Sequence, residues 1–297
     1  MLQVARLASR LLGEATDNVR RYLSTQTVEG GFRDRNGQRD LYYTVFGLDA
    51  VAILDTNDSE LTGWQPDRAA TLAFFESFDA GAGLDLVHLG CLARVWTALG
   101  LDAPPPDPLV DRLLDLRRDD GGWAMTENDD ASTSYGTFVG IGAYQDLGLP
   151  IGQPSRAVDF LTTMALDHGG YALDANTRVA TTPTTAAAVV ALRQLGGTAH
   201  PNTATWLERQ HHRMGGFLAA EGAPMPDLLS TAVALHALSV LEARCDHLRE
   251  PLLDFVDTLW TSTGGFYGNW AEQEIDTEYT FYGLLALGHL AVMDGGS

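Results

Sequence analysis

The feature of this sequence that most constrains its fold is a repeat with a period of 45 to 50 residues. A triplet of two glycines and an aromatic residue begins at Gly30, Gly121, Gly169, Gly215 and Gly264. The last three intervals are 48, 46 and 49 residues, and the first is 91, close to twice that period. Gly81-Ala82-Gly83 stands where the missing copy belongs. Such a period predicts one structural unit repeated six times along the 297 residues.

A second signal follows each triplet and indicates a helix. An Asp or Thr stands four positions before a Thr, Ser or Leu, and small residues then recur three and six positions further on. This spacing is that of one helix face, and Asp and Thr are favourable N-cap residues. Paired glycines are too flexible for a helix interior, so they mark the loop before each helix. The expected N-caps are Asp40, Asp85, Asp130, Thr181, Asp227 and Asp276.

A second set of helices is expected between these. One helix pair cannot bury its own apolar face, so neighbouring pairs stack, and six pairs can close into a ring. The sequence therefore predicts an all-α fold, an (α/α)6 toroid of six helix-pair repeats, as a single domain over residues 1–297 with no dividing linker. The second helices are expected to begin near Val4, Arg68, Leu109, Arg156, Ala204 and Leu252.

Charge and composition exclude several classes of partner. The net charge of -20 argues against binding to nucleic acid or to an anionic membrane, both of which require clustered Lys and Arg. No stretch reaches 18 apolar residues, so no transmembrane helix is expected. Cys91 and Cys245 are far apart, which excludes a disulfide framework, and the first ten residues lack the apolar run of a signal peptide. We therefore expect a cytoplasmic protein, whose oligomeric state the sequence does not reveal.

The repeats resemble those of a known superfamily. Gln210–Phe217, followed by Asp227–Thr231, is similar to the repeats of protein prenyltransferase β-subunits and of squalene and diterpene cyclases. The resemblance extends over nearly the whole chain. It implies an α-α toroid in which the helices that begin at the caps surround a deep central cavity. It implies less about function, because one fold hosts several activities, and other α-α toroids such as polysaccharide lyases share the helix-pair arrangement.

At the positions where protein prenyltransferases bind zinc, this sequence departs from the family pattern. In those enzymes an Asp and a Cys of one repeat and a His of the next bind zinc. The matching positions here hold Asp227, Leu229 and Tyr279. A lone carboxylate does not make a zinc site of that kind. Zinc is therefore not expected, and no residue is assigned as a metal ligand.

Magnesium is expected only if the substrate carries a diphosphate. Arg33, Arg35 and Arg39 lie near the expected cavity mouth, where they could meet such an anion. The alternative is that this loop is simply solvated.

The resemblance to class II terpene cyclases points to a catalytic acid. Those enzymes carry Asp-x-Asp-Asp-Thr, whose middle carboxyl protonates an alkene or epoxide. The matching segment, Asp276–Thr280, places Glu278 at the middle position, with Asp276 to orient it and Tyr279 to donate a hydrogen bond to either acid. The simpler interpretations are that Asp276 is a helix cap and that Glu278 is a first-turn glutamate favoured by the helix dipole. Glu in place of Asp and Tyr in place of the last Asp are departures from the family pattern.

Aromatic residues gather near the expected starts of the inner helices. Their faces would stabilise a cationic intermediate. Asp130 belongs to an acidic run at residues 127–130, which is either a solvated loop or a contact for a metal-bound diphosphate. The aromatic residues of the triplets are instead expected to pack between helices. The expected substrate-binding residues are Tyr42, Tyr43, Phe46, Tyr135, Trp270, Tyr282, Asp130 and Asp227.

These observations lead to one main functional prediction and two alternatives. The main prediction is a class II-type terpene cyclase, an isomerase or lyase of isoprenoid biosynthesis. It would protonate and cyclise an isoprenoid or related polyene, a hydrophobic small molecule, in the central cavity. The alternatives are a non-catalytic binder of a prenyl chain, another apolar molecule or a partner protein, and a prenyltransferase-like protein that works without zinc.

Overall fold

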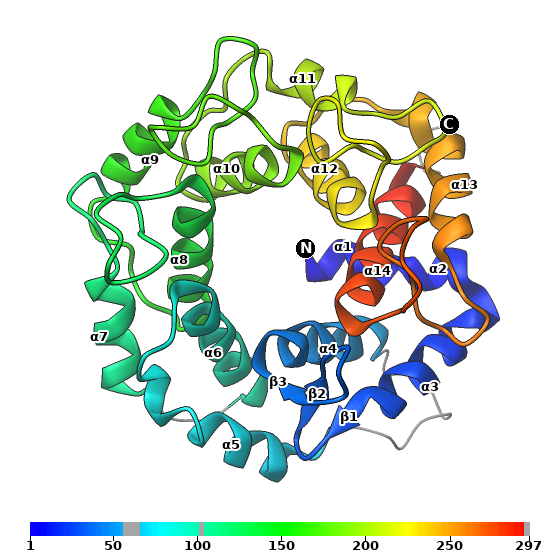
Figure 1. Cartoon of the computed structure of the whole chain (residues 1–297), viewed down its shortest axis with the longest axis horizontal. Coiled ribbons are helices and arrows are strands. Elements are labelled where there is room, and N and C mark those ends of the chain that lie inside the picture. Colours follow the sequence, from blue (N-terminus) through cyan, green and yellow to red (C-terminus); the bar gives the residue numbers. More distant parts are fainter. Residues whose placement is uncertain (56–65, 101–103, 294–297) are drawn as a thin grey trace.

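The computed structural model of the chain describes residues 1–55, 66–100 and 104–293. Its helices form a closed ring of pairs, the expected all-α toroid, with one helix of each pair facing the axis and the other outside (Figure 1). The six inner helices are α4 (Leu41–Leu54), α6 (Leu86–Leu99), α8 (Ser134–Asp146), α10 (Thr182–Gln194), α12 (Leu228–Val240) and α14 (Thr277–Val292). The six outer helices are α3 (Thr16–Gln26), α5 (Arg68–Glu76), α7 (Asp107–Asp115), α9 (Pro154–Thr163), α11 (Thr203–Arg209) and α13 (Arg249–Leu259).

Two sets of contacts close the ring, one between inner helices and one between the triplet loops and the outer helices. Each inner helix packs on the next, and α14 packs on α4. The first glycine of each triplet has a positive φ and lies against the backbone of the outer helix of the following pair. In the last copy this residue is Gly264 (φ 106°), where a Cβ would lie 2.1 Å from the carbonyl oxygen of Asn18 in α3. The last pair is therefore joined to the first in the same way as any other two neighbours.

The repeated Thr connects each triplet to its helix cap. The backbone N–H of Phe217 donates to Oγ1 of Thr231 (2.9 Å), and this hydroxyl donates to the carbonyl of Asp227 (2.7 Å). The same two bonds join Phe32, Thr44 and Asp40 in the first copy. One hydroxyl thus satisfies two backbone groups that the turn leaves unpaired. This is why Thr recurs at that position.

The small residues of the repeat make room for the triplet aromatics. A Cβ at Gly47 would lie 2.3 Å from the ring of Phe32, and one at Gly140 would lie 2.4 Å from the ring of Trp123. The aromatic side chains therefore pack flat against the inner helices, between helices as expected, and Trp123 and Phe32 are almost fully buried.

The second copy, which lacks the aromatic residue, fills the same space differently. Leu89 and Leu92 occupy the positions of the repeated Thr and the small residue. A Cβ at Gly81 would lie 2.4 Å from Cδ2 of Leu89 and 3.4 Å from Cδ1 of Leu92. Two leucines from the helix therefore pack against the loop here. Gly81 ends a short 3-10 helix, η3 (Asp79–Gly81).

Two expected helix starts were wrong. The N-cap of α8 is Thr133, whose hydroxyl accepts from the N–H of Gly136 (2.8 Å), and not Asp130, which is exposed in the preceding loop. The first outer helix is α3, which begins at Thr16 and not near Val4. Gly13 (φ 53°) separates α3 from the N-terminal segment, which packs on α14 and α4 instead. That segment contains α1 (Leu2–Ala5), η1 (Arg6–Ala8) and α2 (Ser9–Leu12), and η2 (Gly13–Ala15) connects it to α3.

The remaining elements are short. A three-stranded antiparallel sheet, β1 (Thr27–Val28), β2 (Gly31–Arg33) and β3 (Arg39–Asp40), pairs Thr27 with Phe32 and Phe32 with Asp40. The 3-10 helix η4 (Asp246–Leu248) precedes α13.

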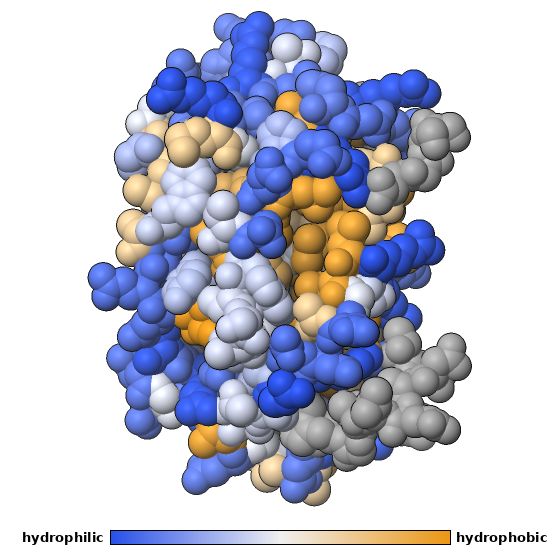
Figure 2. All heavy atoms as spheres, turned by 90° about the vertical axis from the view of Figure 1, so that its right-hand side faces the viewer, coloured by the Kyte–Doolittle hydropathy of each residue, from blue (hydrophilic) through white to orange (hydrophobic). Residues whose placement is uncertain are grey.

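The face shown in Figure 2 has many hydrophilic residues around its margin, in keeping with the net charge of -20. On the side that carries α13 and the N-terminal helices, the same view shows a hollow with apolar side chains inside it (Figure 2). None of the helices in the described part of the chain is both long and apolar enough to cross a membrane.

Candidate active site at the first turn of the inner helices

The residue two positions after each N-cap occupies the first turn of its inner helix. Each is partly accessible, although its neighbours along the chain are mostly buried. The partial accessibility of all six residues shows that side-chain packing does not seal this end of the ring. Glu278 is the one carboxyl among the six, and the other five are aromatic or aliphatic. The six residues are Tyr42, Val87, Tyr135, Pro183, Leu229 and Glu278.

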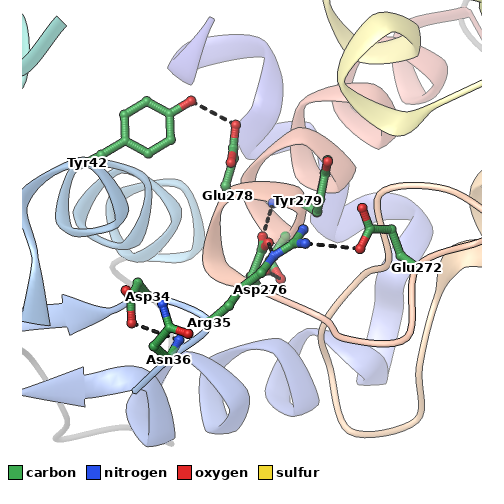
Figure 3. A network of polar contacts seen from close by, with 9 residues as sticks. Asp34, Arg35, Asn36, Tyr42, Glu272, Asp276, Glu278 and Tyr279 are labelled. Carbon is green, nitrogen blue, oxygen red and sulfur yellow. Dashed lines mark hydrogen bonds and ion pairs between the residues drawn. The ribbon is translucent and has the colours of Figure 1, made fainter. Parts of the chain in front are cut away.

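Glu278 is held by a side chain from the other end of the sequence. The hydroxyl of Tyr42 donates to Oε1 of Glu278 (2.8 Å), which links α4 to α14 (Figure 3). Burial raises the pKa of Glu278 to about 6, the bond from Tyr42 opposes this rise, and the charge of Asp276 adds to it. Oε2 of Glu278 has no hydrogen-bond partner among the described residues and is not sealed from solvent. This oxygen is therefore free to carry a proton.

Asp276 belongs to a separate cluster beside Glu278. Its Oδ1 accepts from the N–H of Tyr279 (2.7 Å), and its Oδ2 accepts from Nε of Arg35 (2.8 Å). Arg35 also donates to Glu272 (3.0 Å), and its guanidinium lies 5.4 Å from the centre of the Tyr279 ring. Burial raises the pKa of Asp276, against the bonds from Tyr279 and Arg35. The cluster is drawn in Figure 3.

The expected contact between Asp276 and Glu278 is therefore absent, and that expectation was wrong. As a helix cap, Asp276 turns one oxygen toward its own helix and gives the other to Arg35. The hydroxyl of Tyr279 has no hydrogen bond to either acid in the described structure, and its ring packs against Arg35 instead. The group that orients Glu278 is Tyr42.

Aromatic side chains adjoin Glu278 on two helices. The ring of Tyr42 lies 4.9 Å from that of Phe46, which lies 5.6 Å from that of Tyr282. Tyr282 is partly accessible, and desolvation raises its pKa well above the usual value. Tyr135 occupies the same level on α8, where burial first, and then the charges of Cys91 and Glu278, raise its pKa to about 12. Tyr42, Phe46 and Tyr282 therefore lie beside Glu278, and Tyr135 is near enough for the charge of Glu278 to affect its pKa.

The structure places the other expected substrate-binding residues differently. Tyr43 lies beside the Asp276 cluster, whose charge helps burial to raise its pKa to about 12. Both carboxylate oxygens of Asp227 accept from Ser230 (2.7 and 2.8 Å), as a cap requires. Trp270 packs on Phe255 of the outer helix α13, 5.5 Å between ring centres, and is 39% exposed.

Asp130 and Trp270 consequently do not join the Glu278 cluster. Asp130 is exposed in a loop whose fold is held by Asp129, which accepts from Thr126, and by Arg118, which donates to the carbonyl of Asp129. Trp270 follows a triplet by only a few residues, and the loop carries it outward, where its Nε1 donates to Thr258 of α13 (2.9 Å).

Sequence reasoning did not identify Tyr42 as the partner of Glu278. Both residues occupy the same position of the repeat, and they meet because the first and last inner helices are neighbours in a closed ring. The pair could have been predicted from the sequence, because residues at the same repeat position come together where a closed ring joins its first and last inner helices.

The arrangement suits proton donation. A carboxyl with a raised pKa, oriented by one hydroxyl and bordered by aromatic rings, can hold a proton near neutral pH and deliver it to an apolar group. Aromatic faces can then stabilise a positive charge. Within the described residues there is no group of three or more His, Cys, Asp or Glu side chains that could hold a metal ion.

Comparisons with known proteins give a consistent picture at the level of the fold. The type II terpene cyclase MstE from Scytonema, solved in complex with merosterolic acid A, superposes with a TM-score of 0.65 at 13% sequence identity, covering 96% of this chain and 99% of that one. A protein from Actinoplanes gives a TM-score of 0.59 at 16% identity, over 94% of this chain and 99% of that one.

A longer enzyme shares the fold over half of its length. The ent-copalyl diphosphate synthase from Streptomyces platensis gives a TM-score of 0.54 at 18% identity, over 86% of this chain and 50% of that one. No curated protein sequence matches the chain.

The family comparison is more direct. The model of the prenyltransferase α-α toroid domain matches residues 10–73 and 186–295, more than half of the chain. These segments contain the helices that carry Tyr42 and Glu278. The chain therefore belongs to the prenyltransferase α-α toroid family, within the terpenoid-cyclase and prenyltransferase-repeat superfamily.

Proposed function

We propose that the protein is a class II-type terpene cyclase in which Glu278 protonates an isoprenoid polyene. The observation that carries the proposal is the position of Glu278: a carboxyl at the first turn of α14, in a ring of aromatic and aliphatic side chains, with a pKa raised by burial to about 6. The fold shared with type II terpene cyclases supports it.

The proposed first step transfers the proton from Oε2 of Glu278 to one carbon of a terminal alkene. The alkene π electrons form the new C–H bond, and the positive charge appears on the neighbouring, more substituted carbon. The next alkene of the chain attacks that carbon and closes a ring. The rings of Tyr42, Phe46 and Tyr282 are placed to stabilise the travelling charge.

After the transfer, Glu278 is an anion whose charge must be accommodated. The hydroxyl of Tyr42 already donates to it, and the pKa of Tyr42 is raised by burial, so Tyr42 keeps its proton. The positive charge of Arg35 also favours the anion. Tyr42 is therefore proposed as the orienting group and Arg35 as a stabilising charge. We propose no bound metal for this step, with Mg²⁺ entering only together with a diphosphate substrate.

The experiment is an incubation of the pure protein with farnesyl and geranylgeranyl diphosphates, geranylgeraniol and squalene in D₂O. We expect a cyclised isomer that carries one deuterium from the initiating step, detected by mass spectrometry. Glu278→Gln keeps the shape and the acceptor for Tyr42 but has no acidic proton, so product formation should fall by at least about 100-fold. Asp85→Asn, a change at the N-cap of α6, serves as the matched control and should retain activity.

Two results would contradict the proposal. One is an unchanged rate in Glu278→Gln with its fold intact by circular dichroism. The other is saturable binding of these polyenes with complete recovery of the unaltered ligand, which would favour the non-catalytic binding protein.

A further inference from the structure

The far end of the inner helices carries polar side chains that the proposed protonation step does not use. On α14, Glu278, Tyr282, Leu285 and His289 follow one another at helical spacing and share one face. His289 lies eleven positions after Glu278, about 16 Å along the helix at 1.5 Å per residue. On α12, His236 lies seven positions after Leu229, so it also shares the face of a first-turn residue.

The two histidines form a hydrogen-bonded pair. Nδ1 of His236 lies 3.1 Å from Nε2 of His289, so one ring donates to the other. His289 is 5% exposed, whereas His236 is partly accessible. Nε2 of His236 has no partner among the described residues and is not sealed off. If Nδ1 of His236 carries the hydrogen, it donates to Nε2 of His289. The Nε2 of His236 then presents a lone pair to the accessible side.

Arg94 and two carboxylates at this end are already paired with one another. Arg94 donates to both carboxylate oxygens of Asp49 (3.0 and 3.3 Å) and to Asp146 (2.8 Å). Asp49 and Arg94 lie near the histidines. The amino group of Met1 interacts electrostatically with Asp49 and Arg94, and it also interacts with both histidines. Both carboxylates already accept hydrogen bonds from Arg94, whereas Nε2 of His236 has a lone pair without a hydrogen-bond partner among the described residues.

We infer that His236, positioned by His289, takes the proton that ends the cyclisation, an assignment that rests on the proposed function. In this step a C–H bond next to the cationic carbon breaks, its electron pair becomes the new C=C bond, and the proton moves to Nε2 of His236. The imidazolium then donates through Nδ1 to His289. One proton enters from Glu278 and one leaves to His236, so the product is an isomer of the substrate.

The environment of the two histidines suits a base that must release its proton after each turnover. Burial lowers the pKa of His236 to about 3, and the amino group of Met1 and His289 act in the same direction. Burial and the same amino group lower the pKa of His289 to about 4. Both rings are therefore neutral at physiological pH. A carbocation is acidic enough to protonate even so weak a base, and the proton then passes readily to water.

The test compares the products of His236→Phe and His289→Phe with those of the wild type, using whichever polyene of the panel the wild type cyclises. Formation of the wild-type alkene should fall by about 100-fold in His236→Phe, the lower end of what a positioned base contributes. Alkene isomers or an alcohol formed by capture of water should replace it. His289→Gln retains an acceptor and should keep the wild-type product, whereas His289→Phe should not. His247→Phe changes an exposed histidine on η4 and is the control.

A second readout does not require turnover. The ¹⁵N chemical shifts of the imidazoles, assigned with the same variants, should show His236 and His289 neutral down to pH 5. Protonation of His236 above pH 6 would overturn the inference, as would an unchanged product in His236→Phe. If the wild type forms no cyclised product from any polyene, the proposed function fails and the inference fails with it. If the wild type is active and the His236 variant gives the same product, only the inference fails.

Discussion

Burial favours the neutral form of the Glu278 carboxyl over the anion, although Tyr42 and Arg35 partly offset this preference. Its pKa is about 6 in the folded protein, against 4.5 for an ordinary glutamate. The folded state therefore binds this proton more tightly than the unfolded chain does. The resulting penalty on folding is absent below pH 4.5 and complete above pH 6.

Glu278→Gln should consequently stabilise the protein at neutral pH while it abolishes the proposed activity. One pKa unit corresponds to about 1.4 kcal/mol, so the difference in unfolding free energy between variant and wild type should increase by about 2 kcal/mol between pH 4 and pH 7. Urea denaturation at the two pH values measures it. A difference that does not change with pH would show that Glu278 is not desolvated in the folded state.

The sequence proposed Glu278 as a candidate acid but did not predict the residues that contact it. Its position in the repeat, read through the family resemblance, set it apart from the other five first-turn residues. Its hydrogen bond to Tyr42 depends on side-chain directions across two helices that lie more than 230 positions apart. Asp276 was expected to orient it, but one oxygen of that residue caps α14 and the other accepts from Arg35.

At the scale of the helix, α8 contains glycines in two different environments. A Cβ at Gly140 would lie 2.4 Å from the ring of Trp123, whereas one at Gly142 would have no atom within 4 Å. Gly140→Ala should destabilise the protein by about 1–3 kcal/mol through overpacking. Gly142→Ala should stabilise it by about 0.5–1 kcal/mol, because alanine is the better helix former. Thermal unfolding of the two variants gives the comparison, and equal effects would contradict the packing argument.

Helix existence was predictable from the repeat, while two helix starts were not. Asp is a slightly better N-cap residue than Thr, so local propensity favours Asp130 over the observed cap, Thr133. The choice is made by pairing in the turn, where Trp123 forms a bridge with Thr133, as Phe217 does with Asp227. Near the N-terminus, apolar periodicity alone did not reveal that residues 2–12 pack on α14 and not as the first outer helix.

At the scale of the whole molecule, closure of the ring depends on a contact between its two ends. Gly264→Ala would place a methyl group against the backbone of Asn18 at a residue with φ of 106°, and should cost about 2–5 kcal/mol. Gly148→Ala is the matched control, because its φ is also positive (67°) but no atom lies within 4 Å, so it should cost only about 1–2 kcal/mol. Denaturant unfolding measures both, and an equal cost would show that the contact with α3 adds nothing.

The substitution of two leucines for an aromatic ring in the second copy bears on how members of this family should be aligned. What each unit preserves is the volume between loop and helix, which either a ring from the loop or branched side chains from the helix can occupy. Positions in the two segments should therefore vary together across homologues, with a bulky loop residue accompanying a small helix residue and the reverse. A search for Gly-Gly-aromatic alone would undercount the units, whereas a profile that scores paired volumes would recover all six.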